Sequence, residues 1–424
     1  PFRILVNDTL DLIRDLWVDR PAMPASEAFL FSEAYAGQTR EDKIDRIREK
    51  MQDLGADYHI MTTLDDIAWT LNIRGKDVHT NPVNLAFLLV GVQDVSVFID
   101  EKKLSTGVGA ALEKSGVELS GYAAVATALS RLPGESRLLA DPDSVSRLLY
   151  SAVNPDCTVI EKPSPAIALK AVKNEVQIGH LRQTAVKDGV AMVNFLFWLD
   201  HQKDGQKMTE QSAERQLYAF RSEQDRFVDN SFDPILAWKD HSAMCHYTAT
   251  DQSNALIHGA GMFLIDSGGN YLTGTTDITR TVYMGTPSEQ VRADYTLVLK
   301  AHIAVATAFF PNGTKGFQID ALARRHLWEQ GMDFGHGTGH GVGFFLCVHE
   351  GPARISPHPT DVPLEKGMLL TNEPGIYRDG QYGIRLENMI LVDHAFENTF
   401  GRFLKFENMT WCHFETSLIE SSLL

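Results

Sequence analysis

The sequence of 424 residues has few cysteines, no long apolar run and a shortage of basic residues. Its four cysteines lie far apart and form no CxxC pair, which argues against a disulfide framework or a zinc–thiolate site and favours a reducing, cytoplasmic setting. No stretch of about eighteen apolar residues occurs, so the sequence predicts no transmembrane helix. With 39 Lys and Arg against 55 Asp and Glu, the net charge of −16 argues against nucleic acid or an anionic membrane as partner.

The length predicts two or three domains, and the composition changes at two places along the chain. Residues 1–37 have helical spacing (Leu10, Ile13) followed by a linker rich in Pro, Ala and Ser, which we interpret as the trailing segment of an N-terminal domain absent from this sequence. Residues 38–170 alternate between helical and strand patterns, which predicts a three-layer α/β middle domain. Residues 171–424 begin with a long amphipathic helix and become strand-rich, which predicts an α+β domain with an antiparallel sheet.

Two aspartates lie at the ends of adjacent predicted strands. An apolar run, Met262 to Ile265, ends in Asp266, and a glycine-rich hairpin then returns the chain to Asp277. Such a hairpin brings two carboxylates side by side, which is costly unless a cation lies between them. Two turn-forming aspartates at strand ends are the alternative interpretation.

Three histidines fall within fourteen residues of a glycine-rich segment, at His336, His340 and His349. Glycines allow the backbone to approach a bound group closely, and imidazoles serve as metal ligands and proton donors. A single histidine is usually structural, but this density without an apolar stripe favours a functional site.

Two glutamates, Glu373 and Glu387, each follow a strand-like run, and the turn at Asp379-Gly380 separates them. The pattern repeats that of the aspartates, with exposed strand glutamates as the alternative. Together, four carboxylates and one imidazole form a hard, oxygen-rich ligand set that suits Mn(II), with Co(II) or Zn(II) as alternatives. Four negative charges balance two divalent ions, which we expect roughly 3.5–4 Å apart around a bridging hydroxide.

These motifs resemble the pita-bread metallopeptidases, a family that includes methionine aminopeptidase, prolidase and aminopeptidase P. The strings GTTDITRT, GTGHGVG, NEPG, GIRLEN and VHEGP are most similar to the long eukaryotic-type aminopeptidase P subfamily. The strings at 63–75 and 169–191 resemble the family's creatinase-like middle domain and the start of its catalytic domain. The resemblance therefore implies a creatinase-like α/β middle domain followed by a pita-bread catalytic domain.

The resemblance also implies a role for each of the five candidate ligands. Asp266 would chelate one ion, whereas His340 and Glu373 would bind the other. Asp277 and Glu387 would bridge both ions. Glu373 would in addition act as the general base toward the bridging water.

Four further residues match family positions around the metal pair. His246 and His349 match histidines that bind substrate and handle protons, and are therefore candidate catalytic residues. His336 matches a further substrate-contacting histidine, and Arg385 matches an arginine that steadies the cluster and lies in the substrate site. The chain departs from many relatives at Thr273, where they carry Asp, but this position is not among the five ligands.

The implied function is hydrolysis of the N-terminal Xaa-Pro bond by a hydroxide that bridges two divalent metal ions. Peptides with proline in second position are the implied substrates, and a homodimer is the expected state of the full-length form. A prolidase, restricted to dipeptides, is the main alternative, and a non-catalytic peptide-binding module is disfavoured because all five ligands are present. Trp69, Arg74 and Asn81-Pro82 lie in a middle-domain loop that could approach the site, although ordinary turn and core roles are the favoured interpretation.

Overall fold

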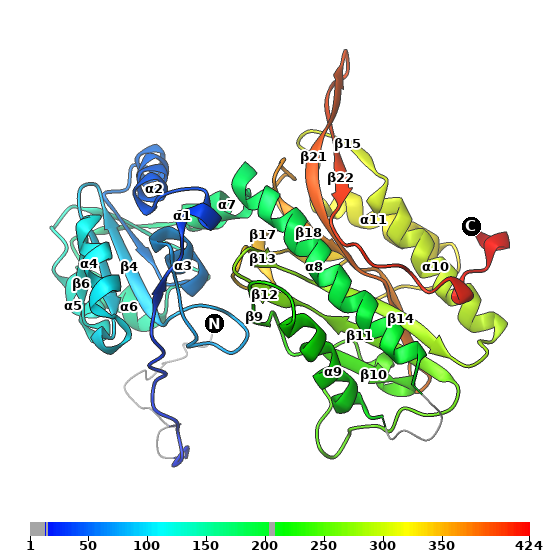
Figure 1. Cartoon of the computed structure of the whole chain (residues 1–424). Coiled ribbons are helices and arrows are strands. Elements are labelled where there is room, and N and C mark those ends of the chain that lie inside the picture. The colour runs from blue at the N-terminus through cyan, green and yellow to red at the C-terminus, as the bar shows by residue number, and fades with distance from the viewer. Residues whose placement is uncertain (1–12, 14–15, 203–207) are drawn as a thin grey trace, which may run out of the picture.

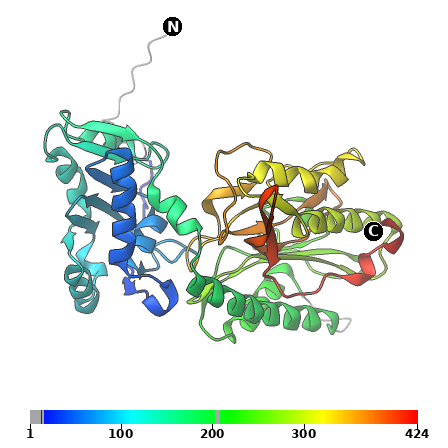
Figure 2. The same cartoon turned by 90° about the horizontal axis from the view of Figure 1, so that it is seen from above.

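The structure is a computed structural model that describes residue 13 and residues 16–202 and 208–424, in two lobes that lie side by side (Figure 1, Figure 2). Part of the predicted N-terminal helix, including Leu10, lies outside the described residues, and the described residues 16–20 form turns. Among the helices of these described ranges, none combines the length and hydropathy needed to cross a membrane.

The first lobe corresponds to the predicted middle domain and is also called the middle lobe below. It is built on a mixed six-stranded sheet of order β6-β5-β4-β2-β7-β8. Its strands are β2 (Tyr58–Met61), β4 (Ala86–Gly91), β5 (Val95–Ile99), β6 (Val117–Ser120), β7 (Arg137–Ala140) and β8 (Thr158–Glu161). Side chains alternate across the sheet, so that Leu88 and Val90 enter one apolar cluster and Leu89 enters another. Both faces of the sheet are therefore buried.

Helices cover both faces, which confirms the predicted α/β middle domain. One face carries α2 (Arg40–Leu54), α3 (Leu64–Leu71), α4 (Thr106–Lys114) and α7 (Pro165–Ala171), and the other carries α5 (Val125–Ser130) and α6 (Arg147–Ala152). Helix α2 begins with a capping box at Thr39 and ends at Gly55 in the left-handed conformation, and both signals are visible in the sequence.

The second lobe contains only antiparallel strand pairs among its described strands, as predicted. One three-stranded sheet holds β10 (Ile235–Trp238), β11 (Gly261–Ser267) and β14 (Ile278–Met284), and another holds β9 (Phe227–Asn230), β12 (Gly269–Tyr271) and β13 (Gly274–Thr275). A six-stranded sheet follows the order β15 (Phe309–Pro311), β22 (Gly401–Asn408), β21 (Asn388–Asn398), β18 (Leu369–Asn372), β16 (Gly339–Gly341) and β17 (Glu350–Ile355). Strands β19 (Gly375–Arg378) and β20 (Tyr382–Arg385) form a separate hairpin.

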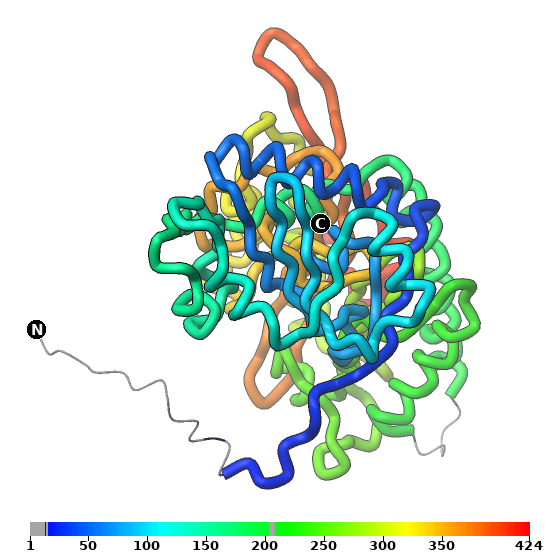
Figure 3. The backbone as a smooth tube through the Cα atoms, turned by 90° about the vertical axis from the view of Figure 1, so that its left-hand side faces the viewer, coloured from blue at the N-terminus to red at the C-terminus, as the bar shows by residue number. Residues whose placement is uncertain are grey.

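Two pairs of helices flank these sheets (Figure 2). Helices α8 (Glu175–Asp200) and α9 (Glu210–Ser222) pack on β10, β11 and β14, whereas α10 (Glu289–Ala306) and α11 (Gly316–Trp328) pack on the strands around β18 and β21. The β21–β22 hairpin projects beyond the body of the lobe (Figure 3). This arrangement leaves the strand ends that carry the candidate ligands between the two helix pairs.

A short segment before the middle-lobe sheet contacts both lobes. Strand β1 (Phe29–Leu30) pairs with β3 (Ile73–Arg74), and α1 (Glu33–Ala36) follows it directly. Phe31 packs with Phe344 and Phe345 of the second lobe. The end of the predicted N-terminal segment is therefore packed against the rest of the chain and helps to join the lobes.

Candidate active site

The aspartate pair lies at one end of the β11–β14 hairpin. Asp266 is paired with Thr279 across the two strands, and Asp277 directly precedes the first residue of β14. Both carboxylates are buried, at 8% and 4% exposure. The glycine-rich turn between the strands therefore brings the two acids to the same place, as the spacing predicts.

His340 and the glutamates come from the six-stranded sheet. His340 lies on β16, which pairs with β18, and β18 pairs with β21 in a register that sets Asn372 opposite Asn388. Glu373 follows Asn372 and Glu387 precedes Asn388, so the two glutamates lie side by side at the same end of this strand pair. Three adjacent strands thus deliver one imidazole and two carboxylates.

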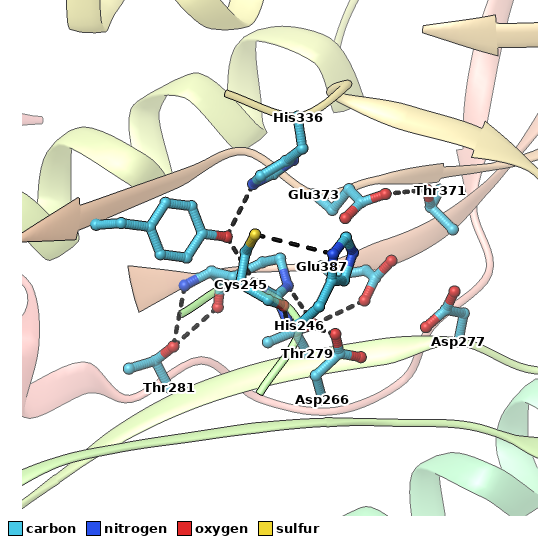
Figure 4. Close-up of polar contacts among 12 residues, drawn as sticks. Cys245, His246, Asp266, Asp277, Thr279, Thr281, His336, Thr371, Glu373 and Glu387 are labelled. Carbon is cyan, nitrogen blue, oxygen red and sulfur yellow. Dashed lines mark hydrogen bonds and ion pairs between the residues drawn. The ribbon is translucent and has the colours of Figure 1, made fainter. Parts of the chain in front are cut away.

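All nine residues singled out from the sequence line one cavity of about 330 Å³. Its lining residues are Phe232, Ile235, Cys245, His246, Asp266, Asp277, His336, Gly337, Gly339, His340, His349, Arg354, Ser356, His358, Glu373, Arg385 and Glu387. Figure 4 shows side chains from both sheets pointing into this shared space. Ligand atoms of Asp277, His340 and Glu387 lie within 4.8 Å of one another, which is close enough for one metal ion.

The ring of His340 is oriented as a metal ligand. Its Nδ1 donates to the carbonyl of Gly341 at 2.9 Å, which leaves Nε2 as the ring nitrogen that can offer a lone pair to a metal. That nitrogen lies 3.4 Å from Oδ2 of Asp277 and 3.6 Å from Oε1 of Glu373. A lone pair that faces two carboxylates lacks a proton donor, and a cation between them satisfies all three groups.

Hydroxyl and guanidinium groups hold three of the carboxylates. Thr279 donates to Glu387 at 2.7 Å and Thr371 donates to Glu373 at 3.1 Å. Arg385 Nη2 donates to Oδ2 of Asp266 at 2.5 Å. These bonds fix one oxygen of each carboxylate, while Oδ1 of Asp266 is buried without a hydrogen-bond partner.

The electrostatics of the cavity also fit divalent cations. Burial, followed by repulsion from neighbouring carboxylates, raises the pKa of both Asp277 and Glu387 well above the usual range. Two guanidinium groups, those of Arg385 and Arg354, line the cavity with four carboxylates. Hard oxygen donors with unbalanced negative charge are the chemistry that Mn(II), Co(II) or Zn(II) requires, so the residues present fit a metal pair.

Two histidines at the cavity wall, His336 and His349, are held in neutral forms. His336 donates from Nδ1 to the Gly337 carbonyl at 2.7 Å, and its Nε2 accepts from the Tyr377 hydroxyl at 2.8 Å. Tyr377 in turn accepts from Arg385 Nη1 at 2.6 Å. Burial, followed by the neighbouring ring of His340, lowers the pKa of His349 to about 4, so the imidazole of His349 is neutral near pH 7.

Sequence reasoning missed several residues that line this cavity or support its walls. Tyr377 lies within the NEPGIYRDG segment, four residues after Glu373, so its place in the motif was the available signal. Arg354 and His358 follow the histidine segment at a spacing that carries no ligand pattern. Phe232 and Ile235 look like ordinary apolar residues, and only the fold shows that they form part of the wall.

Comparison with known proteins decides the family. Residues 179–394 match the model of metallopeptidase family M24, and residues 19–177 match that of the creatinase/prolidase N-terminal domain. The first match alone spans half of the chain. The chain belongs to metallopeptidase family M24. Both halves of this M24 chain, middle lobe and second lobe, are thus of the types that the sequence motifs predict.

Relatives with curated names place this M24 chain in the aminopeptidase P group. It is 41% identical over 435 residues to a probable Xaa-Pro aminopeptidase P from Laccaria bicolor, which covers 99% of this chain and 67% of that protein. A crystal structure of X-prolyl aminopeptidase from Caenorhabditis elegans, described as a cytosolic enzyme with a di-nuclear active site, matches with a TM-score of 0.93 and 35% identity over 98% of this chain and 69% of that one. An Xaa-Pro dipeptidase from Bacillus anthracis shares the fold at 24% identity, with a TM-score of 0.70 over 89% of this chain and 99% of that one.

Proposed function

We propose that this M24 chain is a metalloaminopeptidase that hydrolyses the N-terminal Xaa-Pro bond of peptides with the aid of two divalent metal ions. One observation carries the proposal: four carboxylates and His340 line one cavity, where Nε2 of His340 lies 3.4 Å from Asp277 and 3.6 Å from Glu373. The similarity to named Xaa-Pro aminopeptidases over almost the whole chain supports the same activity.

Asp266, Asp277, His340, Glu373 and Glu387 are the proposed metal ligands. Asp277 and Glu387 are the proposed bridging ligands, because each is buried among the other carboxylates. When bound, the ions supply Lewis acidity and make water a nucleophile at neutral pH. Thr279 and Thr371 hold the two glutamates, so that one oxygen of each faces the cavity in a fixed direction.

Glu373 is the proposed general base. Its side chain is 17% exposed, which makes it the most accessible of the four carboxylates, and Thr371 fixes its Oε1. From this position Glu373 takes a proton from the attacking water and passes it to the leaving nitrogen. The transfer is needed because the nitrogen of proline leaves as a secondary amine.

His349, His246 and His336 are the proposed substrate contacts. His349 stacks edge-on against His340, with ring centroids 4.4 Å apart, and lines the cavity as a neutral imidazole. A neutral ring can donate N–H to the oxyanion that forms at the scissile carbonyl. His246 faces the same cavity. The hydrogen bond to Tyr377 fixes the ring of His336, so that the edge of this ring forms a rigid part of the cavity wall.

Proline selectivity follows from the tertiary amide and the apolar part of the wall. The amide bond to proline has no N–H group and cannot donate a hydrogen bond to the enzyme. A site that holds its substrate with metal ions and histidines does not need that hydrogen bond. Phe232 and Ile235 supply an apolar surface that suits a pyrrolidine ring. Carboxylates in the cavity attract the free α-ammonium group, which favours cleavage at N-termini.

We further propose Mn(II) as the native metal, because four oxygen ligands and one imidazole favour a hard ion, with Co(II) and Zn(II) as alternatives. A homodimeric state and a cytoplasmic location are part of the same proposal. The four thiols are free, which is compatible with a reducing compartment.

The test compares an Xaa-Pro-Xaa tripeptide, an Xaa-Pro dipeptide and an Xaa-Ala-Xaa tripeptide with Mn(II) present. We expect release of the first residue from the Xaa-Pro tripeptide and at most slow cleavage of the alanine peptide. Cleavage of the dipeptide alone would identify a prolidase instead. No cleavage of any peptide by the metal-loaded chain would favour the non-catalytic module.

A further inference from the structure

A segment of the second lobe, residues 343–350, carries His349 into the cavity and has unusual local structure. Phe345 adopts φ of 48°, in the left-handed region that bulky L residues avoid. Such a strained conformation persists only where the surroundings hold it. The groups that hold this segment therefore matter for the placement of His349.

The holding groups come mainly from the middle lobe. Arg74, on β3, is fully buried and donates from Nε to the Phe345 carbonyl at 2.6 Å and from Nη2 to the Phe344 carbonyl at 3.2 Å. It also lies over the ring of Phe31, 4.3 Å from the centroid. The sequence favoured an ordinary turn or core role for Arg74, and its burial confirms the core role. The structure adds that its guanidinium reaches across the interface between the lobes.

Asp65 holds the segment two residues before His349. Its Oδ1 accepts a hydrogen bond from the backbone N–H of Cys347 at 2.9 Å. The intervening side chain, Leu346, is 1% exposed and packs in the apolar cluster of the middle lobe. Both a polar and an apolar anchor of the segment therefore belong to the first lobe.

The residue after His349 is fixed by buried charges. Lys170 Nζ lies 3.4 Å from Oε2 of Glu350 and 3.5 Å from Oδ1 of Asp66, and Lys173 also pairs with Glu350. All four side chains are at most 6% exposed. Two cations and two anions form a cluster without net charge. Both lysines can pair with Glu350 only when Glu350 lies in this position, so the cluster fixes the backbone there.

We propose that Arg74, Asp65 and Lys170 are positioning residues for His349, so that the middle lobe sets the geometry of the active site. They clamp the segment on both sides of His349 and hold the strained backbone at Phe345. None of the three lines the cavity, so each acts through the segment. The inference rests on the proposed function only in the role assigned to His349.

The test is a double-mutant cycle with Asp65→Ala, His349→Ala and the combination, in the full chain with Mn(II) and an Xaa-Pro tripeptide. A displacement near 1 Å in a reacting group can cost roughly a hundredfold in rate, so we expect kcat to fall about tenfold to a hundredfold in Asp65→Ala with KM little changed. In the His349→Ala background the same change should cost less than about twofold, because the positioned group is absent.

Asp57→Ala is the matched control, because Asp57 also accepts a backbone N–H, that of Arg137 at 2.8 Å, but wholly within the middle lobe. It should leave kcat unchanged. Arg74→Lys, which keeps the charge but loses the forked donor, is a second variant that should repeat the kinetic pattern of Asp65→Ala.

Hydrogen exchange of segment 343–350 gives a readout independent of activity. We expect faster exchange in Asp65→Ala and Arg74→Lys, and wild-type exchange in Asp57→Ala. Unchanged exchange in both variants, or kinetic effects that multiply in the double mutant, would overturn the inference. If the wild-type chain cleaved no Xaa-Pro peptide, the proposed function would fail, while the exchange result would still decide whether the middle lobe holds the segment.

Discussion

At the residue scale, the most demanding feature is a set of carboxylates buried against one another. Asp277 and Glu387 are almost fully covered, and their pKa values are raised by burial and by neighbouring acids. A structure keeps such groups together at a cost in stability where they serve a function. Removing one of these negative charges should therefore raise the stability of the metal-free protein and weaken metal binding.

Glu387→Gln tests this opposition. Gln retains the oxygen that accepts from Thr279 and removes one negative charge from the cluster. In chelator we expect the variant to be more stable than wild type by at least about 1 kcal/mol, because repulsion is reduced. With Mn(II) the order should reverse, and kcat should fall by roughly a thousandfold. Thermal unfolding under both conditions measures this, and a variant less stable in chelator would contradict the electrostatic account.

His59 gives a pH-dependent prediction away from the metal site. The ring is fully buried, donates to the Leu139 carbonyl and accepts from Ser164, and burial lowers its pKa to about 4. Because the unfolded chain binds this proton near pH 6.5, stability should be complete above that pH and fall as pH drops toward 4, by about 3 kcal/mol.

Urea unfolding between pH 7 and 4 measures the slope for His59→Asn and for wild type. Asn keeps a donor for Leu139 but does not titrate, so the variant should lose this part of the slope. His394→Asn, at an exposed position, is the control and should keep it. A wild-type slope in His59→Asn would assign the pH dependence to other groups.

Residue types and spacing in the sequence were enough to identify the candidate ligands, because chemistry confines hard metals to few side chains. The same reasoning did not single out Tyr377 or Thr279, although both lie within or beside the ligand motifs, because their hydroxyls act through another residue. It placed Arg74 in an ordinary turn or core role but could not show its contact across the lobes, because nothing in a local pattern reveals a contact with residue 345. The ligand and substrate roles of the predicted residues stay predictions until the variants are measured.

At the scale of elements, the site depends on how closely neighbouring strands approach. Gly339, directly before His340, has no room for a side chain, since a Cβ there would lie 2.0 Å from the Thr371 carbonyl oxygen. Strands β16 and β18 can approach only because this residue is glycine. The placement of His340 relative to Glu373 follows from that approach.

Gly339→Ala should therefore separate the two strands, with a loss of about 1–3 kcal/mol in stability and a large loss of activity. Gly335→Ala is a matched control in the same segment, because a Cβ at Gly335 meets nothing within 4 Å. Urea unfolding and metal affinity check both variants. Equal stability and affinity for the two would show that strand separation is not critical.

Element types were predictable from the sequence to within a few residues, as with the long helix predicted at the start of residues 171–424, which is observed at Glu175–Asp200. Strong apolar periodicity and caps such as Asn174 explain this success. Strand order was not predictable, because β18 lies between β16 and β21 through pairings far apart in sequence. Such pairings depend on the packing of the whole lobe.

At the scale of the molecule, the two lobes share a buried ion cluster and behave as one structure. Glu350 on β17 pairs with Lys170 and Lys173, with side-chain exposures of 3%, 6% and 1%. Removing the anion leaves two buried cations with less compensation. Loss of a charge at this interface should therefore lower the free energy of unfolding far more than loss of a charge at the surface.

Glu350→Gln should cost about 3–5 kcal/mol in the free energy of unfolding. The control is Glu407→Gln, which breaks the exposed pair with Arg182 and should cost at most about 1 kcal/mol. Denaturant unfolding of both variants measures the difference. Comparable losses for the two would mean that the lobes are not coupled through this cluster.

The most direct test of the account is metal stoichiometry measured together with activity. The chain is stripped with a chelator and titrated with Mn(II), while bound metal and cleavage of an Xaa-Pro tripeptide are followed in the same samples. We predict that activity is absent without metal and reaches its maximum at two ions per chain. Full activity in the stripped chain would contradict the account. So would a Glu387→Gln variant that binds the same number of ions and reaches the same maximal activity as wild type, because the metal would then not depend on these carboxylates.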